Sequence, residues 1–275
     1  MGTTRRTIEE GAMRTEMDRR QALVAIGTVS LGTLVAACGR DSASGDGTEA
    51  GTATASVETT DGGTATVQPQ TTGSVSTELF DEAATCAIAT EMTEGPYYFD
   101  VDSIRSDIRE DRSGTALRLA VRVRDASACA PLQNAVVDIW HCDALGLYSG
   151  FETASLGGGG GGTGGRTDDE TYLRGAQVTN ANGIAEFLTV YPGWYRGRTV
   201  HIHAKVHLDR STVLTTQFYF DEEITAAVYE REPYASGEGR DTYNDSDRIF
   251  DERTVLSLSP DGDGYLGLIT LDVEA

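Results

Sequence analysis

Apolar and polar residues alternate along several short stretches of the chain beyond residue 115. The clearest lies at 117–123, where leucine or valine fills every odd position, and arginine stands at 118, 122 and 124. Successive side chains of a β-strand point to opposite faces of its sheet. The pattern therefore predicts a strand with one buried apolar face and with its arginines on the solvent face.

Further stretches carry the same alternation or a short run rich in β-branched and aromatic residues. They lie at 135–141, 183–190, 199–208, 213–220, 255–258 and 265–273. Clusters of Asn, Asp and Gly at 180–183 and 261–264 predict tight turns between strands. Short strands without long helical patterns between them indicate an all-β sandwich or barrel, and we expect an antiparallel β-sandwich.

Two glycine-containing segments resemble ligand-binding loops only in part. Residues 261–264 lack the distal ligands of a calcium loop, which favours a hairpin turn. The glycine run at 157–165 is not followed by the Gly-Lys-Ser/Thr sequence of a phosphate-binding loop. We interpret this run as a mobile surface insertion.

Residues 1–38 have the layout of an export signal. Arg19 and Arg20 precede an apolar run at 22–37, which ends in small residues before Cys38. The paired arginines favour the twin-arginine route, and Cys38 fits the lipobox cysteine that receives a lipid after cleavage. An uncleaved anchor helix is the alternative, although the run is short and rich in Gly and Thr. We expect the folded part outside the cytoplasm, attached to the outer face of the cytoplasmic membrane through a lipid on Cys38.

Residues 39–80 are mostly Gly, Ser, Thr, Ala and Asp, with few large apolar side chains. Such a composition cannot offset the entropy that is lost on folding, so we expect a flexible tether. One folded domain then remains at 81–275, which is long enough to bury a full core.

The formal net charge is -21, and Lys205 is the only lysine. Negative charge of this size argues against binding of nucleic acid and against direct adsorption to anionic lipid, which leaves the lipid anchor as the membrane contact. Abundant acid with scarce lysine is typical of proteins from very salty environments, where surface charge is screened. An ordinary acidic secreted protein is the alternative.

With Cys38 assigned to the lipid, Cys86, Cys129 and Cys142 remain. An odd number of cysteines in an oxidising compartment suggests one disulfide and one free thiol. The sequence leaves open which two residues are paired.

Three of the four histidines lie in the predicted strand at 199–208. On a strand, His201, His203, Lys205 and His207 point to the same face, and two imidazoles two residues apart can bind one metal ion. A chance His-x-His pair on a solvent-facing strand is one alternative. A zinc or copper site is another.

Two tyrosines add oxygen donors near this strand. Tyr195 lies in the segment PGWYRGR directly before it, and Tyr148 ends the loop that follows the predicted strand at 135–141. Ferric iron prefers anionic oxygen ligands, and a bound cation lowers the pKa of a phenol so that tyrosinate can bind at neutral pH. Together with His201 and His203, these tyrosines suit a non-haem Fe(III) ion.

The sequence resembles the intradiol ring-cleavage dioxygenases, in particular the exported single-domain proteins related to protocatechuate dioxygenase subunits. The resemblance covers roughly residues 86–273 and rests on an ordered series of motifs. They are TEGPYY at 93–98, VVDIWHCDALGLYSG at 136–150, YLRGAQVTNANG at 172–183, YPGWYRGRTVHIH at 191–203 and LTTQFYFDEE at 214–223.

The resemblance implies a role for each matching residue. Tyr148, His201 and His203 match the iron ligands that stay bound, and Tyr195 matches the tyrosinate that leaves the iron when substrate chelates. Further matches, which concern the substrate, are Arg198, Gln217, Tyr97 and Tyr98. Arg198 matches the arginine that stabilises negative charge on the substrate ring, and Gln217 matches a glutamine that lines the same pocket.

The segment that holds Tyr97 and Tyr98 lies across the mouth of the site in the family, so either tyrosine is expected to contact substrate. Trp140 is expected in the core, and His141 is expected to be a structural hydrogen-bonding residue. His207 is expected to lie too far along its strand to reach the metal.

The implied function is an enzyme that opens catechol-type rings with O2 to cis,cis-muconate-type products. Its implied partners are a small aromatic diol and O2. A non-catalytic extracellular binding module is the alternative from another class. The interval between Tyr195 and His201 is short, so the substrate preference of better-known relatives cannot be transferred. The helical domain of the catechol-specific branch is not recognised, and the question of a homo-oligomer stays open.

Overall fold

The computed structural model describes residues 55–58, 64–67, 70, 75–80, 86–101, 103–156, 165–208, 211–237 and 239–275. The chain divides into two units, 1–49 and 50–275, and the described residues all belong to the second. The predicted export signal with Cys38, most of the predicted tether and residues 157–164 of the glycine-rich insertion lie outside the described residues. No helix in the described part of the chain is long and apolar enough to span a membrane.

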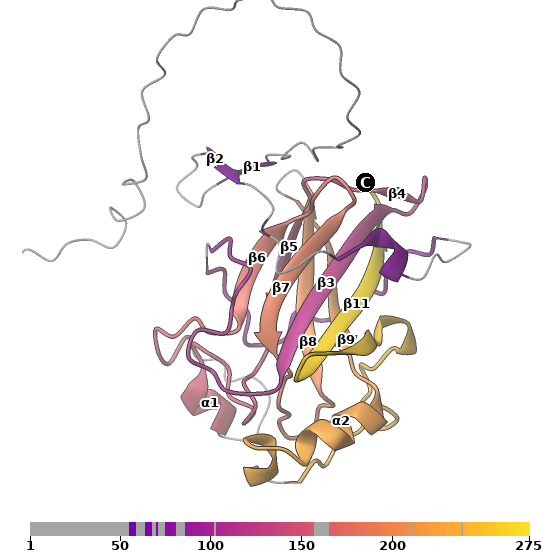
Figure 1. The fold of residues 1–275 in the computed structure, drawn as a ribbon. Helices are drawn as coiled ribbons and strands as arrows, with labels where there is room; N and C mark the ends of the chain where they lie inside the picture. The colour runs from indigo at the N-terminus through magenta and orange to yellow at the C-terminus, as the bar shows by residue number, and fades with distance from the viewer. Residues whose placement is uncertain are drawn as a thin grey trace, which may run out of the picture. The chain divides into compact units, whose positions relative to one another are not determined.

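Two sheets form the body of the domain (Figure 1). The first sheet contains β10 (Ser257–Asp261), β11 (Gly264–Val273), β3 (Ala116–Asp125), β7 (Ile184–Val190) and the short β4 (Ala130–Pro131). The second sheet has the order β6 (Arg174–Val178), β5 (Val136–Trp140), β8 (His201–Leu208) and β9 (Ser211–Tyr219).

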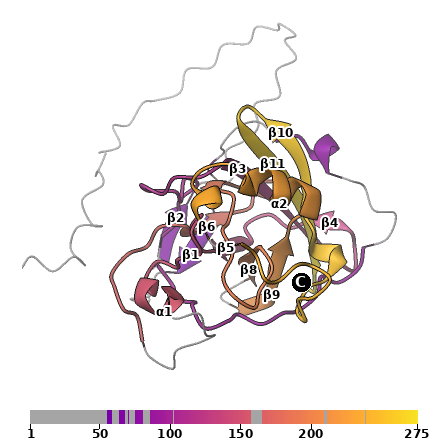
Figure 2. The same cartoon turned by 90° about the horizontal axis from the view of Figure 1, so that it is seen from below.

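The remaining elements are short. They are the paired strands β1 (Ala55–Glu58) and β2 (Thr64–Val67), the helices α1 (Glu152–Leu156) and α2 (Glu222–Tyr229), and the 3-10 turns η2 (Thr77–Leu79), η3 (Tyr234–Ser236) and η4 (Glu252–Thr254). Both α-helices lie at the same end of the strands (Figures 1 and 2). The architecture therefore confirms the predicted all-β sandwich.

The main core lies between the two sheets. The leucines and valines at 117, 119, 121 and 123 are fully buried there, as their alternation predicts. From the second sheet, Ile139, Ile202, Ala204 and Phe218 fill the other side of the same core. Each of these apolar side chains, once fully buried, stabilises the fold by about 1.5–3 kcal/mol before the entropy cost of folding is counted.

One strand pair departs from the predicted antiparallel arrangement. β11 runs parallel to β3, with Tyr265 opposite Leu117, whereas the other paired strands that the structure describes are antiparallel. β10 runs toward the end at which β3 begins, and Asp261 pairs with Gly264 across a tight turn. This turn sends β11 along β3 in the same direction, so the first sheet is mixed. The turn itself confirms the predicted hairpin at 261–264.

The strand predictions are confirmed for β3, β5, β7, β8, β9 and β11, with small shifts at their ends. The predicted strand at 255–258 is partly wrong, because β10 begins only at Ser257, after η4. β6 was not predicted, since its sequence RGAQV has no apolar alternation. β6 is buried by the segment at 103–108 and by neighbouring strands. The local sequence of β6 does not indicate these contacts.

The arginines of β3 do not face solvent as predicted. Arg124 is 3% exposed and donates two hydrogen bonds to the Asp272 carboxylate, at 2.7 and 3.0 Å, and Arg122 is buried as well. The backbone N–H of Ala87 donates to the same carboxylate at 3.1 Å. The prediction fails because N-terminal residues cover this outer face of the first sheet.

Residues 75–80 belong to that cover, although the composition places them in the tether. Phe80 is 3% exposed and lies in a separate apolar cluster with Ala120, Ile184, Leu266 and Leu268. The folded domain therefore begins before residue 81. Farther upstream, β1 and β2 form an antiparallel hairpin inside the predicted tether. Their Thr and Val residues favour strands, a local preference that an average over the whole tether conceals.

The disulfide joins Cys86 and Cys129, and Cys142 is the buried free thiol. The predicted count is confirmed, and the pairing that the sequence left open is now assigned. The bridge fastens the N-terminal segment to the turn between β3 and β4. A cross-link of this kind stabilises a fold mainly by restricting the unfolded chain.

Replacement of Phe80 by alanine tests where the domain begins. Phe80→Ala should lower the free energy of unfolding by about 3 kcal/mol, because it empties a buried aromatic site. Leu79 is 52% exposed, so Leu79→Ala should change the free energy of unfolding by less than about 0.5 kcal/mol. Urea unfolding of the two full-length variants measures both values. Equally small losses would show that Phe80 belongs to an unpacked tether.

Candidate metal centre

The predicted histidine pair lies at one end of β8, on the outer face of the second sheet. Ile202 points into the core, so His201 and His203 point the other way. Both imidazoles are 2% exposed, because loops and N-terminal residues cover this face. The strand ladders place Trp140 of β5 and Gln217 of β9 on either side of His203.

The two imidazoles turn their Nε2 atoms toward each other, at 3.1 Å. His201 Nδ1 lies 2.7 Å from the carbonyl oxygen of Thr199 and donates to it, which leaves Nε2 of the neutral ring with a free lone pair. Burial, followed by the positive charge of Arg198, holds the pKa of both imidazoles well below the usual value. Neutral imidazole is the form in which histidine binds metals.

Tyr148 and Tyr195 reach the same place from two different loops. The Tyr195 hydroxyl lies 3.2 Å from His201 Nε2. The ring centroid of Tyr148 is 5.6 Å from that of Tyr195 and 6.2 Å from that of His203. Burial raises the pKa of both phenols above the usual value, so each stays protonated unless a cation lies close to its oxygen.

These four side chains fit a metal ion. The Tyr148 hydroxyl is buried, and its polar neighbour is the hydroxyl of Tyr195, the other candidate oxygen ligand, so a cation bound by both oxygens would compensate their burial. Two phenolic oxygens with two imidazole nitrogens form a donor set that suits Fe(III). The described ranges contain no group of three or more His, Cys, Asp or Glu side chains that could hold a metal, so a site here depends on the tyrosines.

Arg174 fixes the loop that carries Tyr148. Its Nε donates to the Ser149 hydroxyl and its Nη2 to the Ser149 carbonyl, both at 2.8 Å. Ser149 in turn donates to the carbonyl of Tyr172 at 2.7 Å, and the guanidinium lies 4.2 Å from the ring centroid of Phe99. Because Ser149 directly follows Tyr148, these contacts hold the tyrosine backbone in place. Arg174 was not predicted as a functional residue. Its position in the motif YLRG is the feature of the sequence that could have indicated its role.

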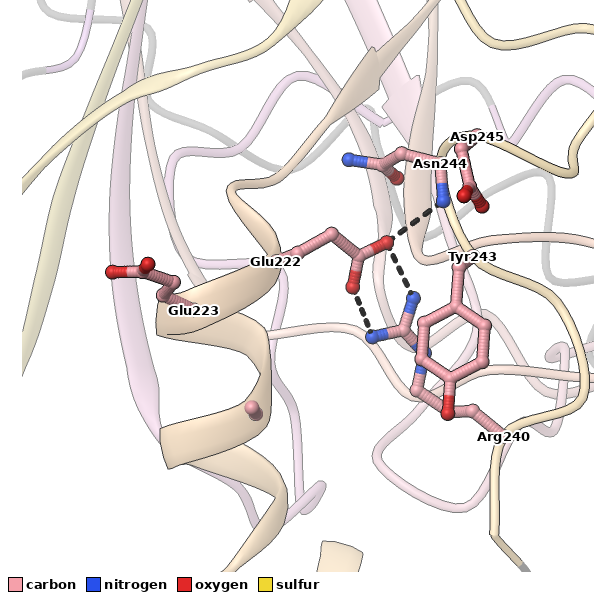
Figure 3. Close-up of a pocket in the computed structure, with 7 residues that line it drawn as sticks. Glu222, Glu223, Arg240, Tyr243, Asn244 and Asp245 are labelled. Carbon is pink, nitrogen blue, oxygen red and sulfur yellow. Dashed lines mark hydrogen bonds and ion pairs between the residues drawn. The ribbon is translucent and has the colours of Figure 1, made fainter.

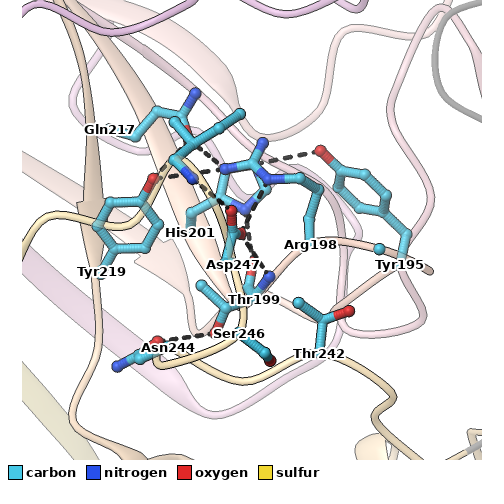
Figure 4. Close-up of polar contacts among 12 residues, drawn as sticks. Tyr195, Arg198, Thr199, His201, Gln217, Tyr219, Thr242, Asn244, Ser246 and Asp247 are labelled. Carbon is cyan, nitrogen blue, oxygen red and sulfur yellow. Dashed lines mark hydrogen bonds and ion pairs between the residues drawn. The ribbon is translucent and has the colours of Figure 1, made fainter.

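Arg198 lies beside His201 and is held by residues from distant parts of the chain (Figure 4). Its Nε donates to Asp247 at 2.9 Å, its Nη2 donates to Gln217 at 2.5 Å, and its Nη1 is 3.4 Å from His201 Nε2. Asp247 also accepts from the Thr199 backbone N–H at 2.9 Å. The structure therefore brings Arg198 and Gln217 together with the histidines, as predicted. Asp247 was missed because its segment NDSDR looks like an ordinary surface turn.

Residues 93–98, here called the strap, cross the face that carries the histidines. Gly95 has a φ of 76° and lies so close to the His203 ring that a Cβ in its place would be 3.1 Å from Cε1. The side-chain amide of Gln217 donates to the carbonyl of Thr93 at 2.9 Å. The strap therefore forms a roof over His203.

The two tyrosines of the strap lie in different surroundings. Tyr97 is 5% exposed, and its ring centroid is 4.8 Å from that of Tyr148 and 6.4 Å from that of Tyr195. Tyr98 packs instead against Trp140, at 4.7 Å between ring centroids. Of the two predicted substrate-contacting residues, the structure thus places Tyr97 beside the candidate ligands.

A family model described as dioxygenase matches residues 93–229, a range that contains the strap and all four candidate ligands. Among solved structures, the intradiol ring-cleavage dioxygenase from Tetranychus urticae is 32% identical to this chain, with a TM-score of 0.64. The alignment covers 69% of this chain and 95% of that protein. This chain belongs to the intradiol ring-cleavage dioxygenases.

Two further comparisons support membership in this family. The dioxygenase domain of a dioxygenase carbohydrate-binding protein fusion from Streptomyces sp. SirexAA-E is 28% identical, with a TM-score of 0.51, over 69% of this chain and 99% of that domain. Chlorocatechol 1,2-dioxygenase from Rhodococcus opacus is 29% identical over 133 residues, which are 42% of this chain and 47% of that enzyme. The chain spans about half the length of the curated relatives that it matches.

The other two histidines of this intradiol dioxygenase family member contact groups outside the donor set. His141 bonds the carbonyl of Cys142 through Nδ1 and the hydroxyl of Thr189 through Nε2, both at 2.7 Å, as expected for a structural residue. His207 lies near the end of β8, where its Nδ1 is 3.1 Å from the Thr212 hydroxyl. None of these three bonds involves a candidate ligand.

The prediction that Trp140 lies in a core is confirmed. Trp140 is 1% exposed and belongs to a second apolar cluster, outside the main core, where it stacks on His203 with centroids 4.9 Å apart and planes 9° apart. It occupies the outer face because it is paired with His203 across the ladder from β5 to β8. The tryptophan therefore fixes the plane of a candidate ligand.

A surface pocket of about 550 Å³ lies beside the start of α2 (Figure 3). Glu222 and Arg240 form an ion pair there, at 2.7 Å, with Tyr243 and Asn244 beside it. None of the predicted metal or substrate residues lines this pocket. This pocket is therefore separate from the candidate metal centre on the covered face of β8.

Replacement of glycines with positive φ tests the close approach of the strap to His203. Gly262→Ala should lower the free energy of unfolding by about 1 kcal/mol, which is the cost of a left-handed backbone for a residue with a Cβ. Gly95→Ala should cost about 1 kcal/mol more, because its Cβ also meets the His203 ring. Gly262 is the matched control, with a φ of 60° and nothing within 4 Å of its added Cβ. Equal losses in urea unfolding would contradict the close contact.

Proposed function

We propose that this protein is a non-haem Fe(III) intradiol dioxygenase that opens catechol-type rings with O2 and forms cis,cis-muconate-type products. The observation that carries the proposal is the meeting of Tyr148, Tyr195, His201 and His203 in one buried space. In the proposal, these residues hold the iron through two phenolate oxygens and two imidazole nitrogens. Matched relatives are named chlorocatechol and catechol 1,2-dioxygenase, which supports a catechol-type substrate.

Ferric iron bound here would supply a Lewis-acid centre for the two oxygens of an aromatic diol. The two tyrosines differ in their freedom to move. Tyr148 is fully buried and its loop is fixed through Ser149, whereas Tyr195 is only partly buried. We assign to Tyr195 the movable position, in which its phenolate oxygen accepts the proton of a substrate hydroxyl. Tyr148 stays in place.

Arg198 provides an oriented positive charge next to the histidines. Its side chain is 15% exposed, and Asp247 and Gln217 fix the direction of its guanidinium. In a site from which water is largely excluded, an oriented cation stabilises negative charge that develops on a substrate ring. Tyr97 adds to this exclusion by covering the two candidate tyrosine ligands.

The visible spectrum of the iron-loaded protein tests the metal assignment. We expect a reddish tyrosinate-to-iron absorption band that shifts when catechol is added without O2. Tyr148→Phe and Tyr195→Phe should each weaken or move the band, because each removes one phenolate. Tyr243→Phe, at an exposed position, should leave it unchanged.

A protein that stays colourless and iron-free after ferric reconstitution would contradict the proposal. Zinc in the same site would also give no colour, so metal analysis of the purified protein separates the zinc alternative from an empty site. A coloured protein that never consumes O2 with any catechol would support a binding function instead.

Substitutions at Arg198 and Asp247 test the charge that acts on the substrate. Arg198→Ala should keep the iron and its band but lower turnover about 100-fold, because it removes an oriented charge near the reacting ring. Asp247→Asn should lower turnover about tenfold, since it weakens the charged hydrogen bond that directs Arg198. Steady-state kinetics and iron content are measured together.

The matched control is Arg253→Ala, which breaks the 2.6 Å ion pair with Asp251, in which the Arg253 side chain is 63% exposed. It should change turnover less than about twofold. Loss of iron together with activity in Arg198→Ala would refute the assigned role.

A further inference from the structure

Lys205 is the only lysine of the chain, and it lies on the same face of β8 as the candidate ligands. It is 8% exposed, although a lysine normally keeps its ammonium group in water. A buried ammonium is costly unless a partner compensates its charge. The position of this residue therefore calls for a specific partner.

Two groups of the strap contact the ammonium. Lys205 Nζ forms an ion pair with the Glu94 carboxylate, and it lies 3.8 Å from the ring centroid of Tyr98. A cation over an aromatic face adds about 0.5–2 kcal/mol of attraction when water is excluded. Lys205 thus holds two points of the strap at once.

Asp138 is a second carboxyl group near this lysine, opposite it in the ladder from β5 to β8, and Asp100 also acts on Asp138 and Tyr98. Burial raises the pKa of Asp138 to about 7, and its side chain is hydrogen-bonded to Tyr98. A carboxyl group with such a pKa carries only part of a negative charge at neutral pH. Glu94 is therefore the carboxylate whose ion pair with Lys205 joins the strap to β8.

Glu94 and Tyr98 are separated by the residues that touch the metal centre. Gly95 lies over the His203 ring, and Tyr97 covers the tyrosine pair. At its start, the strap is held by the hydrogen bond from Gln217 to the Thr93 carbonyl. The ion pair with Lys205 lies within the strap itself, so it determines how closely Gly95 and Tyr97 approach the site.

We propose that Lys205 is a positioning residue that fastens the strap over the metal centre by pairing with Glu94 and by lying against the Tyr98 ring. It touches neither iron nor substrate. The fastening is a property of the protein without metal, and its effect on turnover rests on the proposed function. A released strap would withdraw Tyr97 from the site and weaken the positioning of substrate.

The first experiment uses metal-free, full-length protein in which Trp194→Phe leaves Trp140 as the single tryptophan. Trp140 lies between the strap and a ligand, with its ring centroid 4.7 Å from Tyr98 and 4.9 Å from His203. Lys205→Met, Glu94→Gln and the double variant are compared by Trp140 emission and by hydrogen exchange of residues 91–98. Lys205→Arg is the rescue variant.

We expect each single variant to move Trp140 emission to longer wavelength and to speed exchange within the strap about tenfold. The double variant should be no worse than either single variant, because both changes break the same pair. Lys205→Arg should restore at least part of the protection. In iron-loaded enzyme, KM should rise about tenfold while kcat changes less than about threefold.

The matched control is the ion pair of Arg118 with Asp261 on the first sheet, whose side chains are 20% and 40% exposed, against 10% and 45% for Lys205 and Glu94. Arg118→Met and Asp261→Asn should leave Trp140 emission and strap exchange unchanged. Unchanged exchange of the strap in Lys205→Met, or faster exchange spread evenly over the whole domain, would overturn the proposal. Trp140 emission and hydrogen exchange are measured without metal or turnover. These two measurements therefore test the role of Lys205 even if the protein has no ring-cleaving activity.

Discussion

The candidate metal centre depends on the two-residue period of β8. Ile202, Ala204 and Val206 are packed between the sheets, so a shift of register by one residue would expose all of them. The core thereby forces His201 and His203 to the opposite face, where their nitrogen atoms meet. The neighbouring strands extend this constraint, because each ladder sets one side chain beside His203. Side chains in the core therefore fix the geometry of the candidate ligands on the opposite face.

Around this strand, the molecule places polar groups where they cost stability. The Tyr148 hydroxyl is buried, and so are the cations of Arg174 and Lys205, while the Arg198 side chain is only 15% exposed. Violations of the usual rules for polar burial are expected at functional sites. Each of these three cations is held by a contact that also orders part of the candidate site, through Ser149, Asp247 or Glu94. The contacts that compensate these positive charges are thus the same contacts that order the candidate site.

Much of this arrangement could be predicted from the sequence, because its signals are local. The alternation at 117–123 and 199–208 specifies strands and their buried faces, and ordered motifs identify the four donor side chains. Asp247 and Arg174 could not be predicted, since their partners lie 49 and 25 positions away. The predictions that the β3 arginines face solvent and that all strand pairs are antiparallel fail for the same reason. Both depend on which segments cover or join the sheet, and alternation along one strand does not report that.

The strap also determines the order in which the site can assemble. It emerges early in synthesis, yet its hydrogen bonds and ion pair join it to Lys205 and Gln217, which follow 111 and 124 positions later. Contacts between such distant residues require that the intervening chain be made and closed first. The strap therefore reaches its final position only after β8 and β9 have formed. Until that moment the strap does not cover the donor side chains.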